Sequence, residues 1–182
     1  MRYVAVFCGS QLGTDPRFGE AAEALAEALV GRGLGLVYGG GNVGLMGRLA
    51  DAMLKHKAEV IGVIPQALLE RELGHQALSR LEITGSMHER KARMAELSDA
   101  FIAIPGGYGT LDEWFEILTW RQLGIHDKPI GLLNCAGFFN PLLSFIEHLT
   151  QSGLISSRHR DLFCVGQQPE ILLQQLLPKP KA

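Results

Sequence analysis

The sequence predicts an α/β fold in three layers, with a central parallel sheet between two layers of helices, in a single domain. Two observations predict it. Short runs that are apolar almost throughout alternate along the chain with segments of helical periodicity. Uninterrupted apolar runs are typical of parallel strands that are buried on both faces, and the alternation of strands with helices is typical of β-α-β units.

Five apolar runs are the predicted strands, and a weaker sixth strand is expected at 81–84. The five runs are 3–8 (YVAVFC), 34–40 (LGLVYGG), 59–65 (EVIGVIP), 99–105 (DAFIAIP) and 130–134 (IGLLN). Helices are predicted between and after them, at 16–32, 45–56, 86–97, 111–123, 141–151 and 169–177. The first helix has Thr14 or Asp15 as its N-cap and Pro16 at its first position, where a proline is tolerated.

The length of 182 residues and the apolar content of 47% fit one compact domain with one large core. No repeat, linker or low-complexity stretch divides the chain. We expect the domain to span 1–177 and the tail at 178–182 (PKPKA) to be frayed.

Charge and cysteine content exclude several classes of function. The formal net charge is -2 and the basic residues are scattered, which does not favour binding to nucleic acid or to an anionic membrane surface. The chain starts directly with a strand-like run and has no apolar run of membrane-spanning length, so we expect a cytoplasmic protein. Cys8, Cys135 and Cys164 are far apart beside apolar neighbours, as reduced thiols would be. No His, Cys or Asp cluster has the spacing of metal ligands, so no metal site is predicted.

Glycine-rich turns follow three of the predicted strands, and such turns let backbone N–H groups approach a phosphate. Residues 39–44 (GGGNVG) match the dinucleotide pattern G-x-G-x-x-G, but they follow the second strand. The next strand ends in Pro65 and Gln66, where a ribose-binding acid would be expected. Two interpretations remain for these glycines: they form a wall of a nucleotide cleft, or they let the next helix pack closely on the sheet.

The stretch IPGGYGTLDEW at 104–114 indicates a phosphate site more specifically. Pro105 ends a strand, three glycines form an open turn, and Thr110 stands where an N-cap belongs, so that free N–H groups of the next helix would face the cleft. Thr110 and Glu113 also match a capping box, in which Glu113 would have only a structural role. The pattern alone leaves both roles of Glu113 open.

The segment SMHERKARMAEL is predicted to be a helix with an arginine in its apolar face. That face consists of Met87, Arg90, Met94 and Leu97. A buried arginine needs a partner, and Asp99 or Glu113 could supply it unless Arg90 extends to solvent. We expect Glu89 and Arg93 to form an exposed ion pair, and His88 to lie at the surface.

Three motifs together resemble the Lonely Guy (LOG) family of cytokinin riboside 5′-monophosphate phosphoribohydrolases, often labelled "possible lysine decarboxylase". They are MHERK at 87–91, PGGYGTLDE at 105–113 and QLGIHDKPIGLLN at 122–134, and the likeness spans nearly the whole chain. The resemblance implies a Rossmann-like fold and a homodimer or larger homo-oligomer with its active site near the subunit interface. It also implies hydrolysis of the N-glycosidic bond of an adenine nucleotide without a metal or cofactor.

The resemblance also assigns roles to individual residues. Arg90 and Glu113 match the catalytic pair of the family, and the turn from Gly106 to Thr110 matches its phosphate-binding segment. The residues expected to bind substrate are Ser10, Gly40, Gly41, Met87, Lys91, Gly106, Gly107, Tyr108, Gly109 and Thr110.

The chemistry of the reaction agrees with these roles. Breaking the N-glycosidic bond builds positive charge on the ribose, so a carboxylate near C1′ could stabilise that charge and take a proton from the attacking water. Glu113 is the candidate for this role. Arginine stays protonated, so Arg90 would position and polarise the substrate. Because the 5′-phosphate would help to orient C1′, nucleosides should be poor substrates.

Other functions remain to be weighed. A pyridoxal phosphate decarboxylase needs a lysine for its Schiff base, but Lys91 is the only candidate near the motifs, and the chain is too short for the usual two domains. A broader AMP or pyrimidine nucleotide nucleosidase would share the same cleft. A nucleotide-binding or carrier module of the same fold would bind without turnover.

The helix at 111–123 is apolar on more than one face, which suggests a second buried surface and a homo-oligomer. The apolar residues that make up these faces are Trp114, Phe115, Ile117, Leu118 and Trp120.

Overall fold

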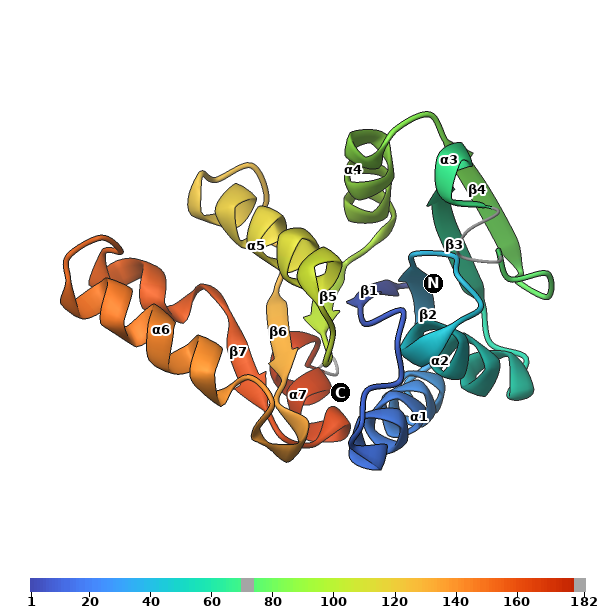
Figure 1. Ribbon diagram of the computed structural model, residues 1–182, viewed down its shortest axis with the longest axis horizontal. Helices are drawn as coiled ribbons and strands as arrows, with labels where there is room; N and C mark the ends of the chain where they lie inside the picture. The colour runs from blue at the N-terminus through green and yellow to red at the C-terminus, as the bar shows by residue number, and fades with distance from the viewer. Residues whose placement is uncertain (70–73, 179–182) are drawn as a thin grey trace.

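The computed structural model describes residues 1–69 and 74–178 of the chain, in which strands and helices alternate as the sequence predicts (Figure 1). The strands are β1 (Tyr3–Phe7), β2 (Gly35–Tyr38), β3 (Val60–Pro65), β4 (Arg80–Thr84), β5 (Ala100–Ala103), β6 (Ile130–Leu133) and β7 (Cys164–Gly166). The α-helices are α1 (Pro16–Gly31), α2 (Gly44–Lys55), α3 (Gln66–Leu69), α4 (Met87–Leu97), α5 (Tyr108–Gln122), α6 (Asn140–Gln151) and α7 (Pro169–Leu176). Two 3-10 segments lie at Cys135–Gly137 and Ser157–Leu162.

All paired strands are parallel, in the order β4-β3-β2-β1-β5-β6-β7. The chain builds outward from β1 to β4 and then returns to place β5 on the other side of β1, so the strand order reverses between β1 and β5. Ligands of such sheets bind beyond the carboxyl ends of the strands at this reversal point. The turns that follow β1 and β5 meet there, since the amide of Gly9 donates a hydrogen bond to the Pro105 carbonyl at 3.1 Å.

Helices cover both faces of the sheet (Figure 1). Successive side chains of a strand point to opposite faces of the sheet. In β1, Val4 and Val6 pack in the apolar cluster under α1, α2 and α7. Ala5 and Phe7 pack in the apolar cluster on the other face, under α4, α5 and α6. Both clusters are buried and apolar, and this explains why β1, β2, β3, β5 and β6 are apolar almost throughout, whereas the edge strand β4 is partly exposed and alternates polar with apolar residues.

The predicted strands and the six predicted helices are confirmed, whereas β7 and α3 are not predicted from the sequence. Both are short: β7 has three residues and α3 has four. Asp15 is the N-cap of α1, where its side chain accepts a hydrogen bond from the Arg17 amide. Residues 179–182 of the expected frayed tail lie outside the described residues.

The expected ion pair within α4 is wrong. Arg93 does not pair with Glu89: it forms ion pairs with Glu82 at 2.7 Å and with Glu96 at 3.0 Å. Glu89 instead accepts a hydrogen bond from the Gly85 amide just before α4. The i,i+4 spacing does not decide the partner because β4 brings a competing carboxylate beside α4.

Candidate active site

A cavity of about 220 Å³ lies beyond the carboxyl ends of β1, β2 and β5, at the reversal point of the sheet. Backbone and side chains of three glycine-rich turns meet there with α4 and α5. Its lining residues are Val6, Cys8, Gly9, Ser10, Gly39, Met46, Leu68, Met87, Arg90, Gly107, Tyr108, Gly109, Thr110 and Glu113. Most of the residues that the sequence and the family resemblance indicate thus come together in one place.

Arg90 and Glu113 form a buried ion pair in this cavity. They come from α4 and α5, and they are 5% and 7% exposed. The distance between Arg90 Nη2 and Glu113 Oε1 is 3.6 Å, which is within reach of an ion pair but longer than a hydrogen bond. Arg90 Nε has no hydrogen-bond partner among the described residues, so this guanidinium retains a buried donor that a ligand could use.

Lys91 holds α4 and α5 together directly behind that pair. Its ammonium group lies 3.1 Å from Asp112 Oδ2 and 3.1 Å from Glu116 Oε1, and its side chain is 10% exposed. Burial acts to lower the pKa of Lys91, but the hydrogen bonds that its ammonium group donates to Glu116 and Asp112 outweigh this effect and leave the pKa raised. Lys91 does not line the cavity. Because Lys91 and Asp112 are the chain neighbours of Arg90 and Glu113, this contact sets how far apart the two catalytic candidates lie.

The N-terminus of α5 opens into the cavity. The helix begins at Tyr108 with Gly107 as its N-cap, and no side chain caps it. The first N–H groups of a helix have no acceptor within the helix, and residues 107–110 all line the cavity. Thr110 therefore lies inside the first turn, and the expectation that it is the N-cap is wrong, as is the capping box built on it.

The glycine turn at 39–44 packs against other parts of the protein, and its first residue, Gly39, lies against Arg90. A Cβ on Gly39 would lie only 2.0 Å from Arg90 Nη2, so the guanidinium occupies the place of that side chain. Gly40 has φ of +78° and packs against Ile64 and Leu81, outside the cavity. Gly41 pairs with Gly74 and does not line the cavity either.

Several lining residues are not predicted from the sequence, namely Val6, Cys8, Gly9, Gly39, Met46 and Leu68. Of these, Cys8 could be mistaken for a nucleophile. Burial raises the pKa of its thiol above its usual range, and the negative charge of Glu113 raises it further. A thiol that stays protonated is a poor nucleophile, so the surroundings of Cys8 do not favour nucleophilic catalysis by its thiol.

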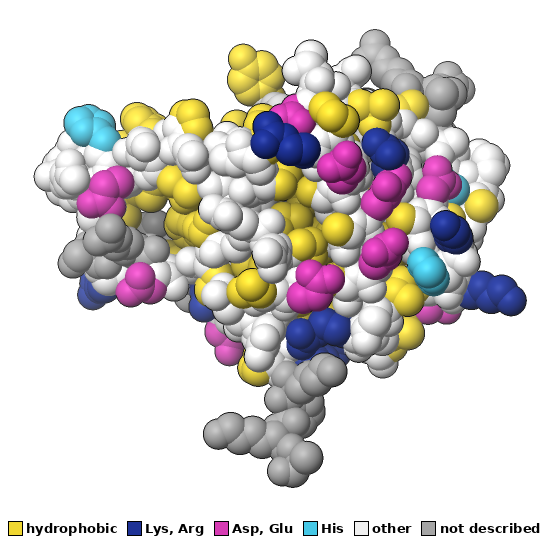
Figure 2. Space-filling view, turned by 90° about the horizontal axis from the view of Figure 1, so that it is seen from below, with side chains coloured by type: hydrophobic (Ala, Val, Ile, Leu, Met, Phe, Trp, Pro, Cys, Tyr) yellow, Lys and Arg dark blue, Asp and Glu magenta, His cyan; other side chains and the backbone are white. Residues whose placement is uncertain are grey.

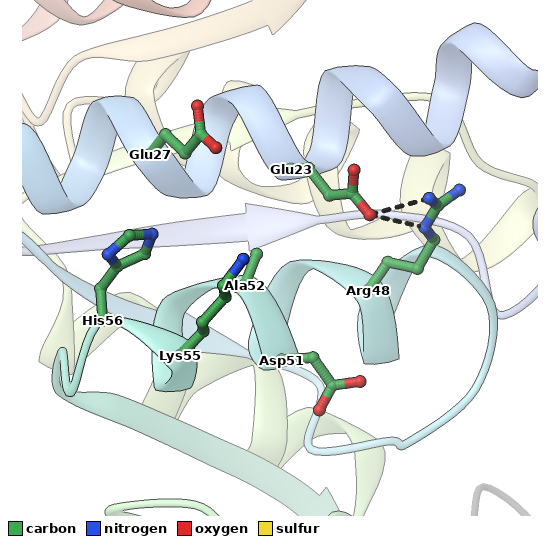
Figure 3. A pocket seen from close by; sticks show the side chains of 7 residues that line it. All are labelled: Glu23, Glu27, Arg48, Asp51, Ala52, Lys55 and His56. Carbon is green, nitrogen blue, oxygen red and sulfur yellow. Dashed lines mark hydrogen bonds and ion pairs between the residues drawn. The ribbon is translucent and has the colours of Figure 1, made fainter.

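A second polar pocket, of about 420 Å³, lies between α1 and α2 (Figure 3). It is lined by Glu23, Glu27, Arg48, Asp51, Ala52, Lys55 and His56. The charges of Glu23 and Arg48 are paired at 2.8 Å, and both side chains are well exposed. On the face shown in Figure 2, acidic and basic side chains are interspersed and no basic patch stands out.

Comparison with known proteins identifies the family. The family model described as "Possible lysine decarboxylase" matches residues 46–176. The probable cytokinin riboside 5′-monophosphate phosphoribohydrolase LOGL2 of Oryza sativa subsp. japonica is 48% identical over 175 residues, which cover 96% of this chain and 72% of that protein. The chain belongs to the LOG family. The cytokinin riboside 5′-monophosphate phosphoribohydrolase LOG1 of Arabidopsis thaliana is 47% identical to this LOG-family chain, over a region that covers 95% of this chain and 81% of LOG1.

The fold of this LOG-family chain is shared with more distant proteins. The molybdenum cofactor carrier protein of Chlamydomonas reinhardtii superposes with a TM-score of 0.74 at 22% identity, over 98% of this chain and 99% of that one. At this identity the likeness concerns the Rossmann-like fold alone. No helix in the described part of the chain has the length and apolar character needed to cross a membrane.

The decarboxylase label of the family does not fit the lysine of this site. A Schiff-base lysine must reach the cofactor and react as a neutral amine. Lys91 lies outside the cavity, and its two carboxylate partners favour the charged ammonium form. The arrangement around Lys91 therefore serves to join two helices rather than to bind pyridoxal phosphate.

Proposed function

We propose that the protein hydrolyses the N-glycosidic bond of adenine-type nucleoside 5′-monophosphates, either AMP or cytokinin ribotides with a substituent on N6. The products are the free base and ribose 5-phosphate. The observation that carries the proposal is the buried Arg90–Glu113 pair beside the uncapped N-terminus of α5. The identity of about 47% with named phosphoribohydrolases over nearly the whole chain supports it.

The 5′-phosphate is bound at the start of α5. The N–H groups of the first turn and the positive end of the helix dipole attract an anion there. A Cβ on Gly107 or on Gly109 would meet nothing within 4 Å, so the backbone of this turn can be approached closely. Ser10 and Thr110, which line the same end of the cavity, add hydroxyl donors.

Glu113 acts at the anomeric carbon. As the bond between C1′ and the base nitrogen lengthens, the base departs with the electron pair and the ribose becomes an oxocarbenium-like cation. The Glu113 carboxylate stabilises this cation and accepts a proton from the water whose oxygen forms the new bond to C1′. The departing base takes up a proton from solvent, and Glu113 returns to solvent the proton that it took from the water, so one water is consumed, the charges balance and the carboxylate is regenerated.

Arg90 positions the reactants. A guanidinium that cannot lose its proton is unsuited to general acid catalysis, but it donates several hydrogen bonds in a fixed plane. Its contact with Glu113 orients the carboxylate, and its Nε, which has no hydrogen-bond partner among the described residues, offers a further donor within the cavity. Met87 Sδ accepts a hydrogen bond from Arg90 Nη1 at 3.7 Å.

Assembly and compartment belong to the same proposal. We expect a cytoplasmic homodimer or higher homo-oligomer. Tyr108, at the edge of the cavity, is 96% exposed, and Phe115 on α5 is 37% exposed. A second copy of the chain packed against α5 would cover both and complete the wall of the site. Light scattering at micromolar concentration should give at least twice the mass of one chain, and a monomeric mass would contradict the assembly.

The activity itself is tested by product release. The protein is incubated with AMP, N6-isopentenyl-AMP, CMP and, as a matched control without phosphate, adenosine, and the products are separated by chromatography. We expect free adenine-type base and ribose 5-phosphate from one or both adenine nucleotides, and little base from adenosine. Release from CMP at a similar rate would indicate a broader nucleosidase. Tight binding of AMP with no release of base would overturn the hydrolase and favour a carrier.

A further inference from the structure

We propose that His75 is a positioning residue for this reaction, which holds the glycine turn at 39–44 in the place that Arg90 requires. The inference rests on the proposed function. His75 lies outside the cavity and in none of the motifs that identify the family, yet it is 6% exposed. Its polar contacts among the described residues are with the turn, with the helix that follows the turn, and with its own loop.

The backbone beside His75 is paired with the glycine turn. The amide of His75 donates a hydrogen bond to the Gly40 carbonyl at 3.0 Å, and Gly41 forms an antiparallel bridge with Gly74. The amide of Gly74 in turn donates to the Leu69 carbonyl at the end of α3, which supplies Leu68 to the cavity wall. Gly74 and His75 therefore contact the glycine turn at 39–44 on one side, and Gly74 contacts the end of α3 on the other.

The imidazole of His75 fixes this segment to α2. Its Nδ1 accepts a hydrogen bond from the Ala77 amide at 3.2 Å, so Nδ1 carries no proton and Nε2 is the donor. Nε2 lies 3.0 Å from Asp51 Oδ1. Both ring nitrogens of a neutral imidazole thus have partners of the right kind, which gives the ring a single orientation.

Asp51 lines the pocket between α1 and α2, but its carboxylate lies in the direction that the contact with His75 requires. In Figure 3 its carboxylate lies on the side of α2 away from α1, whereas Arg48 and Lys55 of the same helix point toward α1. Asp51 is 69% exposed, and its carboxylate oxygen Oδ1 accepts the hydrogen bond from His75 Nε2. The contact between Asp51 and His75 therefore joins α2 to Gly74 and His75, which are paired with the glycine turn just before α2.

The turn held in this way is the surface on which Arg90 rests. Gly39 approaches Arg90 Nη2 so closely that no Cβ fits between them, and the same missing Cβ would lie 3.1 Å from Met46 Sδ on α2. At the other end of the turn, a Cβ on Gly44 would collide with the backbone of Ser10. A shift of the turn would therefore move Arg90 relative to Glu113 and also disturb the wall at Ser10.

The test compares steady-state kinetics of His75→Leu, His75→Gln, Asp51→Ala and Asp51→Asn with wild type on the adenine nucleotide that wild type hydrolyses. Misplacing a catalytic group by about 1 Å can cost up to about 100-fold in rate, and we expect His75→Leu to lower kcat by about tenfold or more. KM should change less than kcat, because the amides of the first turn of α5, which hold most of the phosphate site, are not in contact with the turn at 39–44. Asp51→Ala should lower kcat by about threefold.

Conservative variants should restore the rate. In His75→Gln, the amide can donate a hydrogen bond to Asp51 from a position close to that of Nε2. In Asp51→Asn, the side chain keeps an oxygen that accepts the hydrogen bond from His75. The kcat of both variants should therefore be closer to that of wild type than the kcat of His75→Leu and Asp51→Ala. Lys55→Ala, on α2 but pointing toward α1, is the matched control and should be unchanged. Hydrogen exchange of the amides at 39–45 should be faster in His75→Leu, independently of activity.

A purely structural role would lower the melting temperature of His75→Leu but leave kcat of the folded enzyme unchanged. That result, with active wild type, would overturn the role of His75 while the proposed function stood. Equal losses in His75→Gln and His75→Leu, or unaltered exchange at 39–45, would also overturn it. Failure of wild type to release base from any nucleotide would overturn the proposed function itself.

Discussion

Two glycine-rich turns at the same edge of the sheet differ in what lies against them. In the turn at 39–44 after β2, the glycines make room for protein: Arg90 lies against Gly39, Ile64 and Leu81 against Gly40, and the backbone of Ser10 against Gly44. In the turn at 106–109 after β5, Gly106 is also packed, against Thr110 and the Gly9 backbone, and it does not line the cavity. A Cβ on Gly107 or Gly109 would meet nothing within 4 Å, and both residues face the cavity. The first turn lies against the candidate catalytic residue Arg90, and the outer part of the second turn leaves backbone amides accessible to a ligand.

This difference gives a general criterion for interpreting glycine motifs. A glycine whose missing side chain is replaced by another residue of the protein is required for packing. A glycine that faces open space at a helix N-terminus is compatible with an anion. The dinucleotide-like pattern at 39–44 belongs to the first kind here, although its sequence resembles a phosphate-binding loop.

The largest effect is expected from Gly39→Ala. The new methyl group would lie 2.0 Å from Arg90 Nη2, which is the end of a flexible side chain, so the guanidinium must move while the fold persists. We expect kcat to fall by about 100-fold, with a melting temperature within a few degrees of wild type. Turnover near that of wild type would show that the position of Arg90 does not matter.

The matching change in the second turn is Gly109→Ala, for which we expect a smaller effect of a different kind. The methyl group has space, and alanine favours the helix, so stability should be unchanged or slightly raised. Since the methyl group narrows the approach to the first-turn amides, KM for the nucleotide should rise severalfold with little change in kcat. A clear loss of stability would contradict the open character of this turn.

Lys91→Met tests the contact that joins the two helices behind the site. Removing both ion pairs with Asp112 and Glu116 should let α4 and α5 shift relative to each other, and we expect kcat to fall by about tenfold. Arg93→Ala removes exposed ion pairs from the same helix and serves as the control, with kcat within about twofold of wild type. Equal rates in Lys91→Met and wild type would show that Lys91 does not position Arg90.

The smallest expected effect concerns His126, which lies against the sheet outside both turns. Burial lowers the pKa of His126 below its ordinary value of 6.5, although a hydrogen bond with the Ile117 carbonyl partly opposes this. As the pH falls, His126 therefore takes up a proton at a higher pH in the unfolded chain than in the folded protein. The free energy of unfolding should decrease as the pH falls below about 6.5. Denaturant titrations should show a weaker pH dependence in His126→Gln than in wild type, and identical pH profiles would contradict this.

Much of the fold can be predicted from the sequence because the strands are buried on both faces. Uninterrupted apolar runs such as the one ending in Phe7 need no tertiary information to be recognised. The edge strand β7 and the one-turn helix α3 are too short to produce a pattern, and only their neighbours stabilise them.

The sequence and the family resemblance indicate Arg90 and Glu113 as candidate catalytic residues, and the structure pairs them, but the residues packed around the pair cannot be predicted. Arg90 is conspicuous because it interrupts an apolar face, and Glu113 because it follows a glycine turn. The roles of Gly39 and His75 depend on contacts across the sheet edge, which no local spacing encodes. The sequence places the start of α5 too late, at Leu111 instead of Tyr108, because Thr110 resembles an N-cap while the true N-cap is a glycine without a side chain.

The central claim is that Glu113 acts as a carboxylate at C1′, and the most direct measurement is the turnover of Glu113→Gln on the adenine nucleotide that wild type hydrolyses. Gln keeps the size and hydrogen-bonding capacity of the side chain but removes its charge. The account predicts a fall in kcat of about 100-fold or more, the scale of general base catalysis, with an unchanged fold and binding of the nucleotide retained. A variant that releases base and ribose 5-phosphate at the wild-type rate would contradict it.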